Sequence, residues 1–405
     1  MEAFIITAFF FLQGVFCIDT GVKVAGVDLF DMAILISSGL LALLWLARLT
    51  RRQAQSLSAI DITILLFCGW CFFASLLYAE TSLLRDVVKF TLAPLTYIFM
   101  KSLLFNSKHY KKCLYLLILG LSIPTIISAV MVARGIGLDK VDYWTGLARY
   151  QGIFVNPHNF GHTMAFLAMV IVLYYGLHGT GRELLFVKIP LNKKIMLFVI
   201  GIIALYCLYQ SYVRTAWIGL VVFACSLTFF ISRKKFAGLL FIAFVITALS
   251  IPLLKVVFHD VVEVAEGKRE TERIGSGRPY IWKHNLTQFS QIGLDRQLAG
   301  VGIGNRVGIF REEHNSDNIW NSHNDFLEVM IQTGIVGFCL FCSIQYFFLR
   351  RILSLGNRER YFFTSIFIAV MVMNFFSNSY VVRFSIGQMY YMVMAYIESK
   401  SLYEA

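Results

Sequence analysis

Long apolar runs alternate with short polar connections along almost the whole chain. A run of about 17 to 25 apolar residues is long enough to cross a bilayer as a helix, whereas the strands of a membrane barrel would give short alternating segments. The pattern therefore predicts an all-α polytopic integral membrane protein with about twelve transmembrane helices. The predicted spans are residues 3–18, 30–47, 60–78, 86–104, 112–133, 159–177, 195–212, 215–232, 236–257, 323–349, 361–378 and 382–398.

One long polar stretch interrupts this pattern between residues 258 and 322. It divides the chain into residues 1–257, with nine predicted transmembrane helices and short loops, residues 258–322, and residues 323–405, with three helices and a short cytoplasmic tail. The composition agrees with a membrane protein, because 58% of the residues are hydrophobic and only 15% are charged. Soluble globular proteins carry more charge than this.

The net charge of +12 reflects where the basic residues lie along the chain. Lysine and arginine concentrate in alternate loops, and basic residues in short loops stay on the cytoplasmic side of a membrane. Both termini are therefore predicted to be cytoplasmic, and the loop 258–322 is predicted to lie on the outer face. A nucleic-acid-binding protein would gather these residues on one soluble face, so we expect no nucleic acid partner. The basic loops are residues 48–52, 108–112, 182–194, 233–235 and 350–360.

Four polar clusters lie at the outer boundary of the predicted spans, while the middles of the spans are almost free of charge. Polar residues at membrane depth are costly, and they often mark a functional site. A proton-coupled transporter would place carboxylates or histidines at the midplane instead. The clusters are residues 149–162, 210–217, 275–282 and 320–328.

The eight cysteines predict neither a disulfide framework nor a metal site. The two C-x-x-C pairs, at 68 and 71 and at 339 and 342, lie inside predicted spans and are expected to pack as apolar side chains. No cysteine lies in the loop 258–322, and the sequence contains no zinc, haem or iron-sulfur spacing. We therefore expect no metal and no cofactor.

Each polar cluster has a structural and a functional interpretation. Arg214, in the tight connection between the seventh and eighth spans, is either an anchor at the lipid headgroups or a substrate ligand. Arg278 follows the turn residues G-S-G and precedes a proline, so it is either a solvated loop residue or part of a shaped binding turn. For Asn156, His158 and His162 we favour the structural interpretation, which is packing at the entrance of the sixth span.

His323 has the most specific physical setting of these residues. Ser322 and Asp325 form an S-x-x-D helix-start signal, which predicts that His323 lies in the first turn of the tenth span. The free N–H groups and the helix dipole at that position disfavour a charged imidazole, so His323 is expected to be neutral near neutral pH and able to accept a proton. The same helix end is suited to binding an anion such as phosphate.

Four motifs in the second half of the chain resemble the O-antigen ligase (WaaL) and O-antigen polymerase superfamily. They are Y-V-R-T-A-W at 212–217, G-S-G-R at 275–278, G-V-G-I-G-N at 300–305 and S-H-N-D-F-L-E at 322–328, and the resemblance is clearest over residues 200–345. It implies a glycosyltransferase of the GT-C type in the bacterial inner membrane, with its active site facing the periplasm. It also implies a reaction without a metal, in which a glycan moves from undecaprenyl diphosphate to a sugar hydroxyl of the lipid A-core.

The resemblance also implies roles for individual residues. By motif, His323 is the implied catalytic residue, and Arg214 and Arg278 are the implied ligands of the diphosphate. Arg149, in the short R-Y-Q-G motif, and Asn324, beside the histidine, are further candidates for substrate binding. The implied partners are the lipid-linked glycan donor, the lipid A-core acceptor and the surrounding membrane lipids.

Three other functions remain open at this point. An O-antigen polymerase would use a second lipid-linked glycan as its acceptor, and a protein O-oligosaccharyltransferase would use a serine or threonine hydroxyl. An exporter of lipid-linked sugars, which belongs to a different class of protein, would also have many spans and outer arginines. An exporter is expected to tolerate the loss of His323, whereas a transferase is not.

Overall fold

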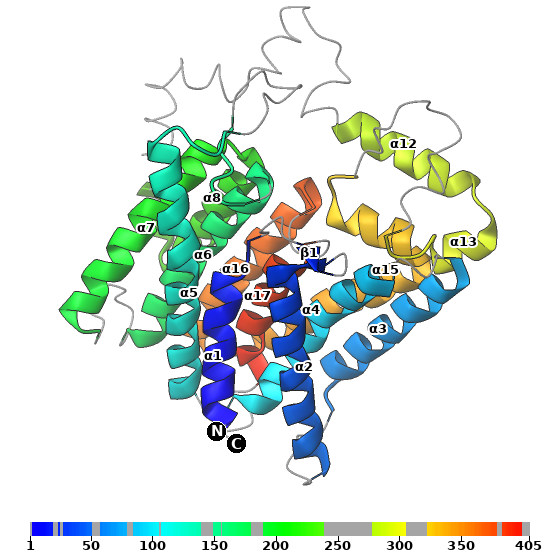
Figure 1. The fold of residues 1–405 in the computed structure, drawn as a ribbon, viewed down its shortest axis with the longest axis horizontal. Helices are drawn as coiled ribbons and strands as arrows, with labels where there is room; N and C mark the ends of the chain where they lie inside the picture. Colours follow the sequence, from blue (N-terminus) through cyan, green and yellow to red (C-terminus); the bar gives the residue numbers. More distant parts are fainter. Residues whose placement is uncertain are drawn as a thin grey trace, which may run out of the picture.

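The computed structural model is built almost entirely of helices, with one two-stranded hairpin of β1 (Lys23–Val24) and β2 (Val27–Asp28) (Figure 1). It describes residues 2–18, 23–24, 27–50, 57–78, 84–104, 107–138, 149–154, 156–179, 189–238, 278–304, 322–378 and 383–398. The helices are α1 (Glu2–Val15), α2 (Leu29–Thr50), α3 (Ala59–Tyr78), α4 (Leu84–Leu103), α5 (Ser107–Ala133), α6 (Pro157–His178), α7 (Leu191–Ser211), α8 (Arg214–Ile231), α12 (Arg278–Gln291), α13 (Leu294–Ala299), α15 (Asp325–Leu353), α16 (Asn357–Phe376) and α17 (Phe384–Met394).

Eight of the described helices are long and apolar enough to cross a membrane: α2, α3, α5, α6, α7, α8, α15 and α16. This confirms the predicted all-α polytopic class. The predicted spans 3–18, 86–104 and 382–398 also fall on helices, α1, α4 and α17, but α1 and α17 have only 14 and 11 residues. The predicted span 236–257 lies outside the described residues after residue 238.

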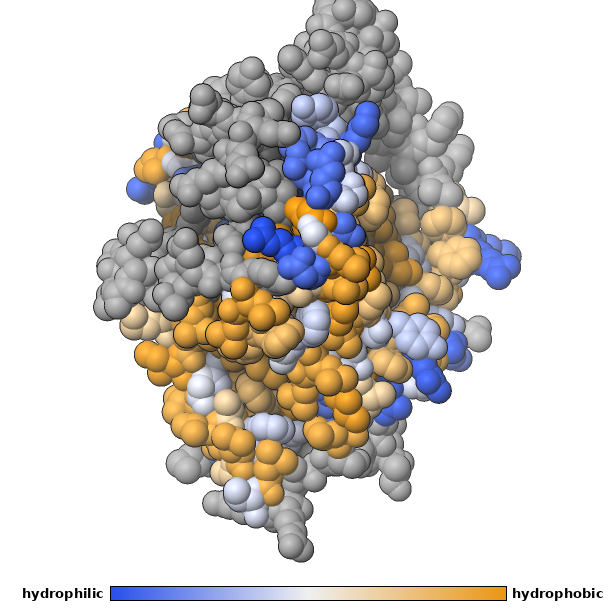
Figure 2. All heavy atoms as spheres, turned by 90° about the vertical axis from the view of Figure 1, so that its right-hand side faces the viewer, coloured by the Kyte–Doolittle hydropathy of each residue, from blue (hydrophilic) through white to orange (hydrophobic). Residues whose placement is uncertain are grey.

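The bundle encloses α6 more completely than the other candidate spans, because 83% of the residues in its most apolar stretch are buried. Long helices on the rim expose apolar side chains instead, as α3 does with Leu66 and Leu76, which are 57% and 79% exposed. Figure 2 shows apolar side chains covering the middle of one face of the molecule. Such a surface is stable in contact with lipid and would be unfavourable in water.

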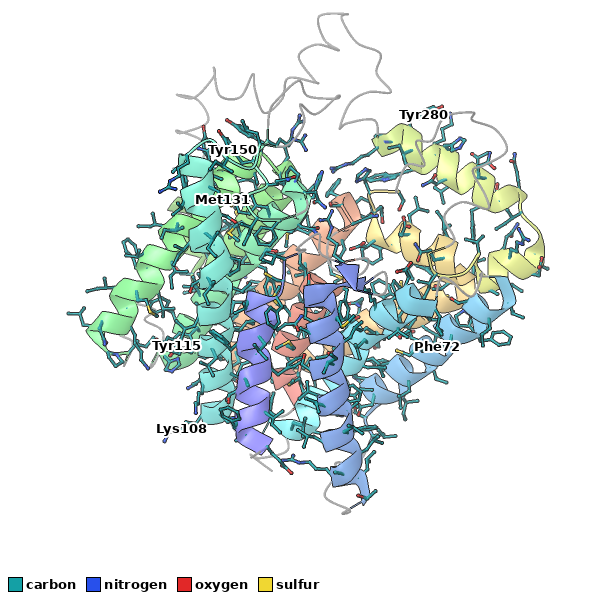
Figure 3. The ribbon with its side chains drawn as sticks, in the orientation of Figure 1. Phe72, Lys108, Tyr115, Met131, Tyr150 and Tyr280 are labelled. Carbon is teal, nitrogen blue, oxygen red and sulfur yellow. The ribbon has the colours of Figure 1, made fainter. Side chains whose placement is uncertain are left out.

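The predicted outer clusters lie at one end of the molecule, opposite the two termini. Figure 3 shows Tyr150 and Tyr280 at one end and Lys108 at the other, where Figure 1 places both ends of the chain. Arg48 of the first basic loop pairs with Glu2 at 2.6 Å, so this loop also lies at the end that holds the termini. The arrangement agrees with the alternation of basic and non-basic loops read from the sequence.

Helix α15 is broken at Gly334, whose φ of 69° interrupts the helical hydrogen bonds. A break of this kind leaves the carbonyl groups of the preceding turn without their helical donors, and buried carbonyls need a partner. Here each of the last three carbonyl groups before Gly334 accepts a hydrogen bond from another segment. The bonds run from Val301 N–H to Ile331 O (3.0 Å), from Gly302 N–H to Gln332 O (3.0 Å) and from the Trp70 indole N–H to Thr333 O (2.8 Å).

The glycines of the G-V-G-I-G-N stretch allow this docking. A Cβ atom on Gly300 would lie 2.4 Å from the carbonyl oxygen of Gln332, and one on Gly334 would lie 2.2 Å from that of Leu298. Gly300 also has a φ of 82°, a conformation that few other residues adopt. The stretch therefore fastens the segment that follows α13 to the broken helix by contact between backbones.

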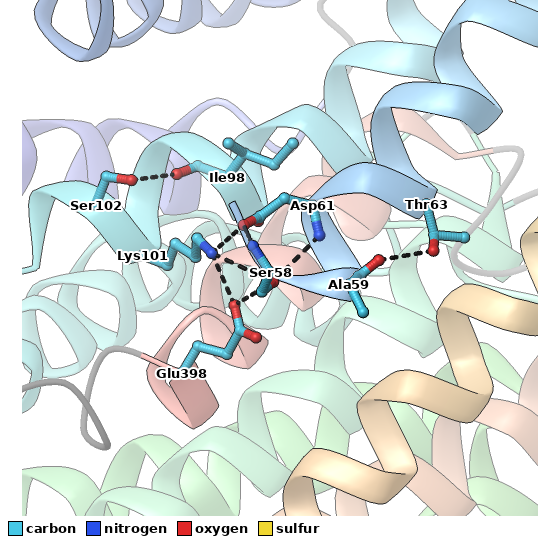
Figure 4. Close-up of polar contacts among 8 residues, drawn as sticks. All are labelled: Ser58, Ala59, Asp61, Thr63, Ile98, Lys101, Ser102 and Glu398. Carbon is cyan, nitrogen blue, oxygen red and sulfur yellow. Dashed lines mark hydrogen bonds and ion pairs between the residues drawn. The ribbon is translucent and has the colours of Figure 1, made fainter. Parts of the chain in front are cut away.

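At the other end of the molecule, three charged side chains form a buried network (Figure 4). Lys101 of α4 binds Asp61 of α3, and its Nζ lies 2.9 Å from Oε2 of Glu398, just beyond α17. All three side chains are buried, and Ser58 donates its hydroxyl to Glu398 at 3.0 Å. The network joins α3 and α4 to the C-terminal segment.

Removing only the cation of this network is expected to destabilise the fold. Lys101→Met removes the cation that two buried carboxylates share, and breaking a buried ion pair typically costs about 3 to 5 kcal/mol. Thermal unfolding in detergent should show a clear fall in Tm, whereas Lys108→Met, at an exposed position of the same end, should leave it unchanged. Neutralising the carboxylates as well, with Asp61→Asn and Glu398→Gln, should recover most of the loss. An unchanged Tm for Lys101→Met would contradict this account.

Candidate active site

The start of α6 brings two histidines to the outer end of the bundle. Asn156 caps the helix, because its side-chain oxygen accepts the N–H of Asn159 at 2.8 Å, and Pro157 fits the first helical position. One turn further, His162 is fully buried, with its Nδ1 3.0 Å from the carbonyl oxygen of His158. Its Nε2 lies 3.3 Å from Oγ1 of Thr215 on α8, so the first turns of α6 and α8 are in direct contact.

Arg214 is placed by a tight turn between α7 and α8. Tyr212 ends α7 with a φ of 50°, and Arg214 is the first residue of α8. The turn packs closely on α6, since a Cβ atom on Gly161 would lie 2.7 Å from Cβ of Val213. The N–H of Tyr150 donates to the carbonyl oxygen of Gln210 at 3.2 Å. This bond brings the segment that carries Arg149 to the same turn.

Arg149, Arg214 and Arg278 form one group of positive charges. Arg278, the first described residue of α12, is partly buried, and burial together with the charges of Arg214 and Arg149 lowers its pKa to about 10. A guanidinium with that pKa is still charged near neutral pH. Three cations gathered in a poorly solvated place attract an anion strongly, and planar guanidinium groups match phosphate oxygens in pairs.

His323 lies just before α15 rather than in its first turn, which corrects the prediction from the S-x-x-D signal. Asn324 caps the helix, with its side-chain oxygen accepting the N–H of Leu327 at 3.0 Å, and His323 precedes this cap with a φ of 48°. The structure therefore gives Asn324 a capping role. A non-glycine residue with positive φ is uncommon and is held there by its surroundings.

Each polar group of Ser322 forms a hydrogen bond, and these bonds fix the backbone that precedes His323. Its N–H and its hydroxyl both donate to Oε2 of Glu328, one turn into α15. Its carbonyl oxygen accepts the indole N–H of Trp282 from α12 at 2.8 Å. Gln332 in turn donates to the other oxygen of Glu328 at 2.6 Å. These long-range partners explain why Ser322 does not cap the helix.

His158 links His323 to the cations. The ring centroids of the two histidines are 6.2 Å apart, and the charges of Arg383 and Arg149 both act on the His158 ring. Arg383, directly before α17, donates to the side-chain oxygen of Asn156 at 3.2 Å. The structure thus brings His323, Arg149, Arg214 and Arg278 to one site.

Sequence reasoning gave no role to two members of this site, Trp282 and Arg383, and it assigned a third, His158, to packing at the entrance of the sixth span. For Trp282 a signal existed, because it follows Arg278 by four residues and therefore shares its face of a helix. For Arg383 and His158 the only signal was their place at the outer end of a span. Their contact with His323 and Asn156 comes from the packing of α6 against helices that are distant in sequence.

In the described part of the chain, four helices begin beside these residues: α6, α8, α15 and α17. Helix N-termini carry partial positive charge and free N–H groups, so they favour a bound anion in the same way as the arginines do. Three imidazoles, those of His158, His162 and His323, lie among these cationic groups, and His323 has the strained backbone conformation. The arrangement suits a reaction in which an anionic leaving group departs while a neutral group loses a proton.

Comparison with known proteins agrees with this chemistry. Residues 198–342 match the family model described as O-antigen ligase. No curated protein matches the chain closely enough to be counted as a relative. The matched segment runs from α7 to the middle of α15 and includes the turn between α7 and α8, α12 and the start of α15. The region of the chain that carries Arg214, Arg278 and His323 is therefore similar to the O-antigen ligase family.

Proposed function

We propose that the protein is an O-antigen ligase of lipopolysaccharide biosynthesis. It transfers a glycan from undecaprenyl diphosphate to a sugar hydroxyl of the lipid A-core, at the periplasmic face of the bacterial inner membrane. One observation carries the proposal: His323 lies with the arginine cluster of Arg149, Arg214 and Arg278 at the end of the bundle opposite the termini. The family match over 198–342 supports it.

In this mechanism His323 acts as the general base. Its imidazole takes the proton of the acceptor hydroxyl, the hydroxyl oxygen bonds to the anomeric carbon of the first donor sugar, and the bond from that carbon to the diphosphate oxygen breaks. A single displacement of this kind inverts the anomeric centre, as it does in inverting glycosidases. General base catalysis typically contributes about 10² to 10⁴ in rate, so it accounts for part of the catalysis.

The arginines provide the rest by stabilising the leaving group. Negative charge grows on the diphosphate as the glycosidic bond breaks, and Arg214 and Arg278 bind its oxygens while Arg149 adds to the positive field. The N-termini of α6, α8, α15 and α17 act in the same direction. Since these groups already supply the positive charge that the departing diphosphate needs, we propose that the reaction requires no metal or other cofactor.

The position of the site suits substrates that are both anchored in a membrane. The isoprenoid chain of the donor and the acyl chains of the acceptor stay in the bilayer, so their sugars meet at its surface rather than at its midplane. In this proposal residues 258–322 are the periplasmic loop, and α12 and α13 are the described part that covers the site. The nine helical segments predicted before this loop and the three after it form the membrane part.

Purified protein tests the proposal directly. Undecaprenyl-diphosphate glycan and lipid A-core are mixed with the protein in detergent and EDTA, and the core lipid is followed by gel electrophoresis. The expected result is a core lipid shifted to higher mass without added metal. Elongated polyprenyl glycan alone would show a polymerase instead. A parallel reaction with a protein acceptor in place of the core lipid would reveal an oligosaccharyltransferase, and the absence of any product in both reactions would favour an exporter.

A further inference from the structure

Trp282 has no part in the chemistry above, yet it contacts the backbone next to the base. Its indole N–H donates to the carbonyl oxygen of Ser322 at 2.8 Å. That carbonyl and the N–H of His323 belong to the same peptide unit, which is planar. The bond therefore fixes the orientation of the peptide plane that precedes His323. The φ of His323 is the rotation about the bond that joins this plane to its Cα atom.

The other side of His323 is fixed as well. Asn324 caps α15, so the peptide that follows His323 is held by the helix. The left-handed φ of 48° thus lies between two anchored peptide planes. A strained conformation at a non-glycine residue persists only where the surrounding contacts impose it. The indole bond acts on this peptide directly, whereas the contacts of Ser322 with Glu328 act on its N–H and its hydroxyl.

The same helix carries a diphosphate ligand. Arg278 and Trp282 are four residues apart on α12, so they lie on one face of it. We propose that Trp282 is a positioning residue for His323, and that α12 sets the distance between the anion site and the base. This inference rests on the proposed transferase function. It adds a residue that neither the motifs nor the family match assigns a role.

The conservative variant Trp282→Phe removes the N–H donor and keeps an aromatic ring against Phe375, whose ring centroid lies 5.4 Å away. A misplacement of about 1 Å in a reacting group can lower a rate by about a hundredfold. We expect kcat to fall about 10-fold to 100-fold on that basis. The KM for the donor should stay near its original value, because Arg278 and its neighbours are intact.

Trp70→Phe is the matched control. Its indole also donates to a carbonyl of α15 at 2.8 Å, but at Thr333, beside the break and ten residues after His323. Loss of a comparable hydrogen bond should lower the Tm of both variants to a similar extent. If Trp282 has only a structural role, the two variants should show the same kcat, and that result would overturn the inference.

A double-mutant cycle with His323→Asn separates positioning from general damage. If Trp282 acts through His323, Trp282→Phe should cause almost no further loss of rate in the His323→Asn background. Trp70→Phe should cause the same proportional change in both backgrounds. Independent, multiplying effects of Trp282→Phe and His323→Asn would overturn the inference.

A readout without turnover keeps this inference distinct from the proposed function. In protein labelled with ¹⁵N-histidine, the signals of His323 are identified by their absence in His323→Asn. They should shift or broaden in Trp282→Phe and remain in place in Trp70→Phe, and unchanged signals in both would overturn the inference. If the wild-type protein makes no glycan product, the proposed function fails, while the histidine signals still decide whether Trp282 positions His323.

Discussion

Replacing His323 with asparagine is expected to slow glycan transfer by about a hundredfold to ten-thousandfold, the usual contribution of a general base. Donor binding should persist, because the arginine cluster is unchanged. Asparagine is the appropriate substitute, since it tolerates the positive φ of this position better than alanine does. Retention of labelled undecaprenyl-diphosphate glycan measures binding, and the gel shift of the core lipid at saturating substrate measures turnover.

The same substitution at His178 provides the control. His178 ends α6 at the opposite end from the site, and its Nδ1 lies 3.0 Å from the carbonyl oxygen of Tyr174. His178→Asn should transfer glycan at close to the original rate. A His323→Asn protein with full activity would remove His323 from the mechanism. A protein that moves lipid-linked glycan across vesicle membranes equally well with either residue would be an exporter.

Arg278→Lys is expected to be nearly as inactive as Arg278→Ala, with a loss of about a hundredfold to a thousandfold in kcat. An ammonium group cannot make the paired hydrogen bonds of a guanidinium. The site adds a second reason, because it holds the pKa of Arg278 at about 10. A lysine has an ordinary pKa of about 10.4. In the same surroundings the pKa of a lysine would be lowered as well, so it would lose its charge at a lower pH than the arginine does.

The lowered pKa predicts a pH dependence for Arg278→Lys, whereas the loss of paired hydrogen bonds does not. A cation whose pKa is lowered keeps its charge below that pKa and loses it as the pH rises through it. Binding of inorganic pyrophosphate to Arg278→Lys, relative to the wild-type protein at each pH, should therefore strengthen from about pH 9 to about pH 7. Arg296→Lys, at an exposed position on α13, should behave as the wild-type protein. Full activity of Arg278→Lys would show that paired recognition is wrong.

The long helices could be predicted from the sequence because lipid imposes a minimum length and an apolar surface on them. Spans such as α5 and α6 satisfy both conditions within one continuous segment. The ends of the bundle were less predictable. α17 has 11 residues and is almost wholly buried among other helices, so its neighbours rather than lipid determine its extent.

The limit of prediction from local sequence is clearer at the site. An S-x-x-D signal forms a reciprocal cap at Ser58 and Asp61, where each side chain accepts the backbone N–H of the other, at 2.7 and 3.3 Å. The identical signal at Ser322 and Asp325 does not form such a cap. There the serine is held by Glu328 and by Trp282, which lies 40 residues away in the chain. Local spacing predicts a local cap, and it contains no information on a distant competing partner.

The individual arginines could be identified because each stands in a short motif at the outer boundary. That Arg149, Arg214 and Arg278 meet could not be read from those motifs, since it depends on how α6 packs against the turn between α7 and α8. The roles of the glycines at 300 and 334 were equally hidden. Each is required by the approach of the other's backbone.

The break in α15 separates two mechanical tasks. The segment after Gly334 passes through lipid and can tilt as the thickness of the bilayer changes, which is how spans usually accommodate mismatch. The short segment before it is fastened to the outer loop by the bonds of Val301 and Gly302. The position of His323 is therefore tied to the protein rather than to the tilting segment, and in the proposed function this would keep the base in register with two lipid substrates in membranes of different composition.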